Sequence, residues 1–209
     1  MKLYLIILLM LCSFVSCAFF NMSKGTVIKH SIKLEGKNTN IRDLIDIDGY
    51  YSATGYEKNH DGLMFFEDGT YMNIYFKEGA ITDSIQKNMT KWLYKWTDKN
   101  GQIQCAVDEG TYRIEGDTII VRNIFISYAL LRRWESAESK FKVIDRTTIN
   151  SSYNDYYSGE RVNRKYMFVS CDSLPTADMP LKEHKWIWRN EQDWKDYMQR
   201  IEQKKIKKK

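Results

Sequence analysis

Histidines and paired carboxylates are the side chains of this sequence that could carry general acid–base or metal chemistry. The three histidines, His30, His60 and His184, stand far apart in the chain. None lies at metal-ligand spacing from another histidine, a cysteine or a glutamate. Their polar neighbours indicate surface or turn positions. The sequence therefore predicts no metal and no cofactor.

Carboxylates occur in three close pairs, and two of them could serve as the acid and base of a hydrolase, because that chemistry needs one raised and one ordinary pKa. The pairs are Asp46 with Asp48, Glu67 with Asp68, and Asp108 with Glu109. All fall at expected turns, where such residues are commonly solvated. The nucleophile-elbow, phosphate-loop and dinucleotide motifs are also absent from the sequence. We therefore expect that the protein is not an enzyme. A hydrolase that uses these carboxylates is the third interpretation, after the two binding functions described below.

Aromatic residues give the strongest functional signal, since the chain has 14 Tyr, 9 Phe and 6 Trp. Trp92, Tyr94 and Trp96 share one face of an expected strand, and Tyr71 and Tyr75 share a face of another. In a closed sheet such a face either lines a cavity or fills the core. Tyrosine and tryptophan also keep a polar group, so these five residues are the candidate ligand-binding residues.

The composition, with 43% hydrophobic and 28% charged residues, is that of a globular domain. Aromatic runs with period-two alternation, separated by turn residues, indicate antiparallel strands. Asp68-Gly69 predicts a two-residue type I′ hairpin, and Lys58–Gly62 a turn. The expected strands are Gly49–Ala53, Leu63–Phe66, Thr70–Phe76, Lys91–Trp96, Gln102–Val107, Gly110–Ile114, Thr118–Tyr128, Lys140–Ile149 and Arg164–Cys171.

Two helices are expected beside these strands. A short one covers Ile41–Ile47, capped by Asn40. The other closes the chain after a cap at Asn190. Its apolar face has the i, i+3, i+4, i+7 spacing of Trp194, Tyr197, Met198 and Ile201. We expect that face to pack on the sheet.

The first twenty residues form an export leader, with Lys2 before an apolar run from Leu3 to Leu11. Phe14-Val15-Ser16-Cys17 resembles the bacterial lipobox, which predicts a lipid on Cys17. Two alternatives stay open: cleavage after Ala18, or an uncleaved anchor over the apolar stretch to Phe20. Each of the three places the folded body outside the cytoplasm.

Two cysteines, Cys105 and Cys171, remain in the body of the chain. An oxidising compartment permits a disulfide between them. Two buried free thiols are the other possibility, because cysteine also packs as a small apolar residue. The sequence leaves both open.

The net charge of +5 comes from the two ends of the chain. Lys2 and five lysines among the last six residues account for six of the 32 basic residues, which leaves 26 against 27 acidic ones in the body. A nucleic-acid-binding face needs a concentrated positive charge on the folded part, so no nucleic-acid partner is expected. Lys204–Lys209 is interpreted as a solvated, frayed tail.

The leader, the Gly49-Tyr50-Tyr51 start, the hairpins at Phe66–Thr70 and Gly110–Ile114 and the closing helix together resemble the lipocalin-like group of small bacterial lipoproteins. Lipocalins carry Gly-x-Trp in the first strand, and Tyr51 occupies the tryptophan position here. The resemblance implies an antiparallel up-and-down β-barrel with a C-terminal amphipathic helix, whose mouth holds one small ligand.

The chain is accordingly divided into a signal peptide (1–16), a lipid-anchored tether (17–40), a barrel with its closing helix (41–203) and a basic tail (204–209). The expected function is a module of the bacterial cell envelope that binds a hydrophobic or amphipathic small molecule, or a protein partner. It would sit on the periplasmic side or at the cell surface. The alternative is a structural or interaction subunit of an envelope complex with a filled barrel.

Replacing Cys17 tests the anchor. Cys17→Ser should release the protein from membranes, because it removes the sulfur that would carry the lipid. Fractionation of membranes and soluble material, followed by immunoblotting, measures this. Continued membrane association would favour the uncleaved anchor.

Overall fold

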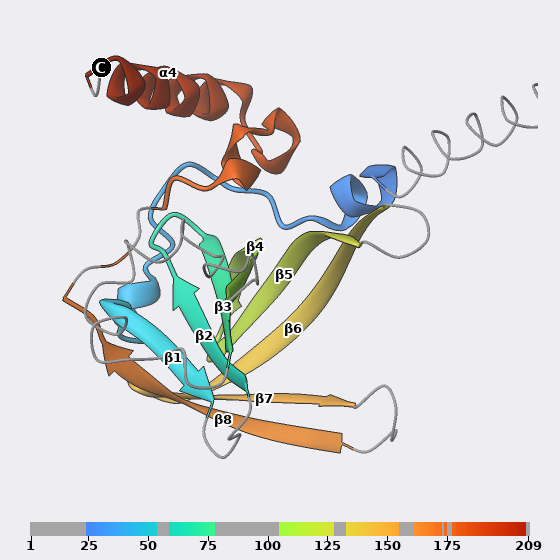
Figure 1. The fold of residues 1–209 in the computed structure, drawn as a ribbon, viewed down its shortest axis with the longest axis vertical. Helices are drawn as coiled ribbons and strands as arrows, with labels where there is room; N and C mark the ends of the chain where they lie inside the picture. The colour runs from blue at the N-terminus through green and yellow to red at the C-terminus, as the bar shows by residue number, and fades with distance from the viewer. Residues whose placement is uncertain are drawn as a thin grey trace, which may run out of the picture.

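The computed structural model describes residues 24–53, 59–77, 105–127, 133–154, 161–172, 174 and 177–207. Eight antiparallel strands follow one another around a closed barrel in sequence order (Figure 1), which confirms the predicted mainly β barrel. The strands are β1 Gly49–Ala53, β2 Asn59–Phe65, β3 Thr70–Lys77, β4 Cys105–Glu115, β5 Thr118–Ser127, β6 Arg133–Asp145, β7 Thr148–Asn154 and β8 Arg161–Ser170. The predicted strand Lys91–Trp96 lies outside the described residues.

The barrel closes where β1 pairs with β8, from Gly49 opposite Ser170 to Ala53 opposite Tyr166. Gly49 is required at this junction. A Cβ added there would lie 2.1 Å from the carbonyl oxygen of Val169, well inside the distance that atoms tolerate. Its small size therefore permits the close approach of the first and last strands.

Side chains alternate between two buried environments along most strands. Those pointing inward form the barrel core, which includes Tyr51, Phe65, Tyr71 and Phe141. Outward-pointing residues such as Ile74 are buried too, beneath segments that lie against the outside of the barrel. The sequence pattern of β3 suggested one buried face, whereas the structure buries both.

Three short hairpins meet at one end of the barrel, which we call the hairpin end. The first confirms the predicted reversal at Asp68-Gly69 but not its turn type. Gly69 has a φ of 89°, whereas Asp68 is not among the residues with positive φ. The Gly69 N–H donates to the Phe66 carbonyl at 3.1 Å. The result is a three-residue loop with glycine in the left-handed position, and not a type I′ turn.

The second hairpin turns at Gly116-Asp117, as predicted, and joins β4 to β5. The third turns at Arg146-Thr147 and divides the predicted single strand Lys140–Ile149 into β6 and β7. No glycine or proline marks this turn. The Asp145 carboxylate makes it instead, accepting the Thr147 N–H at 2.8 Å. The predicted turn at Lys58–Gly62 is also wrong, because β2 begins at Asn59.

Three isoleucines close the barrel interior at the hairpin end. Ile41 begins the 3₁₀ helix η1, Ile41–Asp43. Ile41, Ile45 and Ile47 are all buried in the same cluster as the inward-facing aromatics. The predicted helix here is therefore shorter than expected. Asn40 makes no side-chain cap and adopts a left-handed conformation with φ 60°.

Part of the predicted tether packs on the barrel instead of standing free. Residues 31–40, which we call the strap, run beside residues 177–189, which we call the C-terminal segment. The Leu34 N–H donates to the Ile187 carbonyl at 2.8 Å, and the Arg189 N–H donates to the Leu34 carbonyl at 2.9 Å. Leu34 and Ile187 are buried with Ile124 on the outer face of β5. This apolar contact is what holds the strap.

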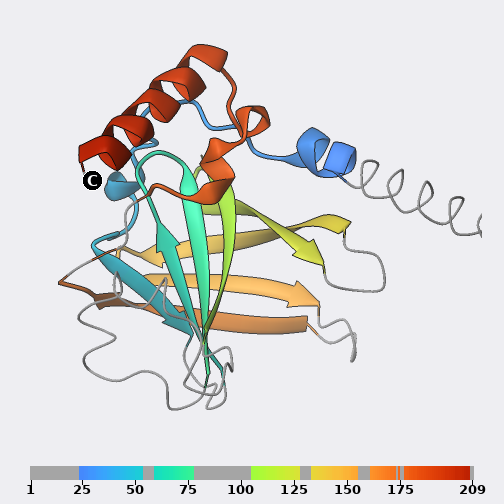
Figure 2. The same ribbon diagram turned by 45° about the horizontal axis from the view of Figure 1, so that its top comes forward.

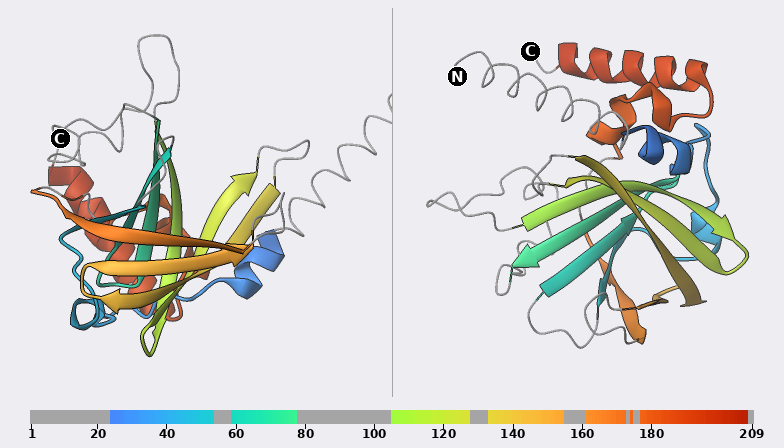
Figure 3. Two further views of the ribbon diagram at one scale, coloured as in Figure 1. Left: turned by 90° about the horizontal axis from the view of Figure 1, so that it is seen from below. Right: turned by 90° about the vertical axis from the view of Figure 1, so that its right-hand side faces the viewer.

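The C-terminal segment contains the short helices η2, Pro180–Glu183, and η3, Lys185–Ile187, and leads into helix α4, Glu191–Lys207. Asn190 caps α4 as predicted, since its side-chain oxygen accepts the Gln192 N–H at 2.8 Å. The helix lies outside the barrel and across the C-terminal segment (Figure 3). Tyr197 of α4 packs against Trp188 of that segment, with ring centroids 5.4 Å apart and the ring planes tilted by 39°.

The helix continues through the lysines that were assigned to a frayed tail. Lys204 pairs with Asp178 at 2.6 Å, and Lys205 lies 3.9 Å from Glu183. Lysines at a helix C-terminus are favoured by the helix dipole. The described part of the tail, up to Lys207, is therefore helical.

A buried ion pair fastens the C-terminal segment to the hairpin end. Lys182 is 1% exposed, and its ammonium group pairs with Asp68. The ammonium also lies 4.8 Å from the ring centroid of Tyr197 and 5.8 Å from that of Trp188. The β2–β3 hairpin, the C-terminal segment and helix α4 therefore all contact the Lys182 ammonium group.

β6 and β7 pair over only part of their lengths. Their pairing runs from the hairpin as far as Phe141 opposite Ser151. Beyond it, Arg133–Lys140 of β6 pairs only with β5, and Ser152–Asn154 of β7 only with β8. Figures 1 and 2 show β6 turning away from β7. We call this unpaired stretch of the barrel wall the slot.

Breaking the buried pair should be costly. Asp68→Asn leaves the Lys182 ammonium buried without its counter-ion, so the free energy of unfolding should fall by about 2 kcal/mol. The asparagine can still accept the Thr70 N–H that Asp68 accepts at 3.1 Å, so the turn is retained. Urea denaturation followed by circular dichroism measures the change.

The matched control is Glu67→Gln, whose partner Arg42 is half exposed. Exposed ion pairs contribute about 1 kcal/mol or less, so the control should unfold close to wild type. Equal effects of the two substitutions would contradict the assigned role of Lys182.

Candidate ligand-binding site

A cavity of about 520 Å³ lies within the barrel beside the slot. Residues of six strands, including both sides of the slot, line it. The lining residues are Leu63, Tyr71, Asn73, Asn123, Glu138, Ser139, Lys140, Phe141, Ser151, Ser152, Arg164 and Tyr166. The four connections at the end of the barrel opposite the hairpin end lie outside the described residues. The cavity thus begins where the filled core ends.

Aromatic rings form the apolar wall of the cavity. Phe141 packs edge-on against Tyr166 at 5.8 Å between ring centroids, and against Phe65 at 6.2 Å. Tyr71 lies 6.4 Å from Phe141. Because these rings are buried and support one another, they form a preorganised apolar surface.

The lining is polar two positions along the same strands, where Asn73 follows Tyr71 and Arg164 precedes Tyr166. Asn73, Asn123 and Ser151 are buried, and Arg164 is half-buried. Asn123 is 8% exposed, and its side-chain oxygen has no hydrogen-bond partner among the residues that the structure describes. A buried polar atom without a partner costs free energy, so its retention needs a reason. A ligand group that donates a hydrogen bond would satisfy it.

Of the predicted binding residues, Tyr71 lines this cavity. Tyr75 lies in β3 two positions further along, and its side chain is outside the described part of the structure. Trp92, Tyr94 and Trp96 also lie outside the described residues, as does the predicted lipid site Cys17. The prediction that these residues bind a ligand is therefore untested by the structure.

The polar residues of the cavity were missed as binding residues. The pattern did place Asn73 on the face of Tyr71. Asn123 follows Ile119 and Val121 at period two, so its inward position was readable from the predicted strand Thr118–Tyr128. Ser151 and Arg164 carried no comparable signal, because their positions depend on how β7 and β8 pair.

The structure resolves the alternatives for the cysteines. Cys105 begins β4, opposite Phe76 and far from the hairpin end. Cys171 follows β8 at the hairpin end, where its N–H donates to the Asp48 carbonyl at 3.1 Å. A disulfide needs Cα atoms within about 7 Å. Cys171 is a free thiol, with its pKa raised by burial, so the proposed disulfide is not formed.

Four of the paired carboxylates are held by cationic side chains. The pairs are Asp46 with Arg146, Asp48 and Glu67 with Arg42, and Asp68 with Lys182. The hydrogen bond from Arg42 lowers the pKa of Asp48. These contacts join η1 and the residues before β1 to the hairpins, and the first hairpin to the C-terminal segment, so they give these carboxylates a structural role.

Asp108 and Glu109 lie inside β4 and not at the expected turn. Glu109 is on the outer face, where its carboxylate accepts the Leu181 N–H at 2.8 Å. Burial raises the pKa of Glu109, and the hydrogen bond partly offsets this. The hydrogen bond between Glu109 and Leu181 connects β4 to the C-terminal segment.

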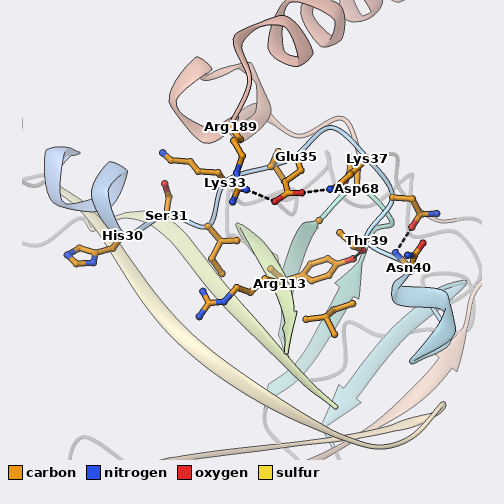
Figure 4. Close-up of a pocket in the computed structure, with 16 residues that line it drawn as sticks. His30, Ser31, Lys33, Glu35, Lys37, Thr39, Asn40, Asp68, Arg113 and Arg189 are labelled. Carbon is orange, nitrogen blue, oxygen red and sulfur yellow. Dashed lines mark hydrogen bonds and ion pairs between the residues drawn. The ribbon is translucent and has the colours of Figure 1, made fainter. Parts of the chain in front are cut away.

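A second cavity of about 550 Å³ lies at the hairpin end beneath the strap (Figure 4). Three of its charged groups pair with one another, since Glu35 lies 2.7 Å from Lys37 and 2.9 Å from Arg189. Hydrogen bonding by Lys37, assisted by the charge of Arg189, lowers the pKa of Glu35. The Tyr112 hydroxyl at its base donates to the Phe66 carbonyl at 2.6 Å. The lining is largely satisfied internally, so the interior cavity is the stronger candidate.

Comparisons with protein-family models, with curated proteins and with solved structures found no match to this chain. Within the described ranges, no three histidine, cysteine, aspartate or glutamate side chains lie close enough to hold a metal ion. The helices in the described part of the chain are too short or too polar to cross a membrane.

Removing the unpartnered polar atom should stabilise the fold. Asn123→Leu keeps a similar side-chain volume and deletes the buried oxygen, so the free energy of unfolding should rise by about 1 kcal/mol. Urea denaturation measures it. Tyr71→Leu is the comparison, because it removes packed aromatic surface and should be destabilising. A destabilised Asn123→Leu protein would show that the asparagine serves the fold.

Proposed function

We propose that this protein is a membrane-anchored, lipocalin-like barrel that binds an amphipathic small molecule in its interior cavity. The observation that carries the proposal is the mixed lining of the cavity, in which aromatic rings lie beside the polar side chains of Asn123, Ser151 and Arg164. A predicted lipid on Cys17 would hold it on the outer side of a membrane.

The size and chemistry of the cavity support a ligand with two unlike parts. Its volume of about 520 Å³ falls within the range of small-molecule pockets. The apolar part would displace water from Phe141, Tyr166 and Leu63. The polar part would hydrogen-bond with the Asn123 amide and the Arg164 guanidinium. Both groups then contribute to affinity, and the polar groups fix the orientation.

The rival interpretation, an interaction subunit with a filled barrel, is less well supported. The hairpin end is filled, but the interior beside the slot is not. Large apolar side chains exposed in the described residues are Ile144, Met167 and Ile206, which stand on three different elements. A docking face would need a contiguous apolar patch.

Native mass spectrometry tests the proposal. Protein from Ala18 onward, purified from an oxidising compartment, should carry an excess mass that disappears on denaturation. The same preparation should bind 1-anilinonaphthalene-8-sulfonate with an increase in fluorescence. Ser151→Phe fills the cavity and should abolish both signals.

The control is Asn163→Phe, which adds the same ring at an exposed position of β8, next to the lining residue Arg164 but outside the lining itself. It should keep both signals, because adjacent strand residues point to opposite faces. A bare polypeptide mass together with no dye binding by the wild-type protein would favour the filled-barrel interpretation.

A further inference from the structure

The cavity and the slot occupy the same part of the wall. Glu138, Ser139 and Lys140 line the cavity from β6, and Ser151 and Ser152 line it from β7. These are the residues on either side of the point where the two strands stop pairing. The cavity therefore reaches the barrel surface sideways, between two strands.

Both sides of the slot are hydrophilic. Lys140 is 63% exposed on the β6 side. Glu138, next to it, is paired with Arg122 at 2.6 Å on the outer face. Ser139 and Ser151 have inward positions behind these charges, as their spacing from Phe141 and Ile149 requires. Polarity thus decreases from the slot to the aromatic wall.

We propose that the interior cavity is entered through the slot between β6 and β7, and that its ligand is an elongated single-chain amphipath. This inference rests on the proposed function. The chain lies against Phe141, Tyr166, Tyr71 and Leu63, while the polar end stays at the slot beside Ser139, Ser151 and Arg164. The polar slot thus suits the polar end of such a molecule, and the aromatic lining suits its apolar end.

The geometry favours a narrow chain over a compact ring system. Pairing persists at Phe141 with Ser151, so the slot narrows to a closed apex there. A single acyl chain can pass lengthwise beside that apex without separating further strand pairs. A wide ligand could reach the apex only by breaking the hydrogen bonds that close the β6–β7 hairpin.

The test follows binding of cis-parinaric acid, a fluorescent single-chain probe, to the full exported protein by stopped-flow fluorescence. Lys140→Trp places a large ring at the edge of the slot, on the outer face. Association and dissociation should both slow by about tenfold while the dissociation constant stays nearly constant, because a narrowed entrance alters both rates equally.

The matched control is Lys142→Trp. Lys142 is exposed on the same face of the same strand, but it is paired with Asn150 in the closed part of the wall. Its rates should equal those of the wild type. Unchanged rates in Lys140→Trp, in a protein that does bind the probe, would overturn entry through the slot.

A second variant tests entry through the slot even if Lys140→Trp does not fold. Lys140→Cys, in a background that carries both Cys105→Ser and Cys171→Ser, is alkylated with a bulky maleimide after the protein has folded, and the same rates are measured. Slowed exchange supports the slot, and unchanged exchange refutes it. Absence of cis-parinaric acid binding by wild type, with dye binding retained, refutes the elongated ligand. Absence of both refutes the proposed function.

Discussion

The pairing of β1 with β8 is the constraint on which the rest of the structure depends. An antiparallel sheet becomes a barrel only when its first and last strands meet, and here they meet over the five residues of β1. Gly49 permits that approach. The residues just before β1 and just after β8 are held together as well, because the Cys171 N–H donates to the Asp48 carbonyl. Both ends of the barrel sheet therefore lead into the hairpin end.

The barrel is divided into a half that secures the fold and a half that is free to bind. At the hairpin end, Ile41 and Ile45 fill the interior, while the Lys182 ion pair fixes the outer layer. Beyond Phe141 the wall divides and the lining becomes polar. Burying polar groups such as Asn123 lowers stability, and the filled half compensates for that loss. This division is common where a rigid scaffold carries a site.

Local pattern was enough to predict the barrel but not its site. Strands with clear alternation, such as β3 and β5, were recognised because every second residue meets the same environment. The turn at Arg146-Thr147 was not predicted, because the Asp145 carboxylate stabilises it and no glycine or proline marks it in the sequence. The strap has no periodicity, and Leu34 is buried through contacts with residues about 150 positions away. The cavity depends on the register of distant strands, which no single segment encodes.

The divided wall leaves two strand edges whose backbone groups are not paired across the slot. Such edges invite pairing with another chain, the route by which sheets polymerise. β6 carries charges along its edge, including Glu138 and Lys140 on the outside. Glu135 occupies an inward position on the same strand, and a foreign strand would have to bury that carboxylate. The sequence of β6 thus opposes fibril formation at the slot.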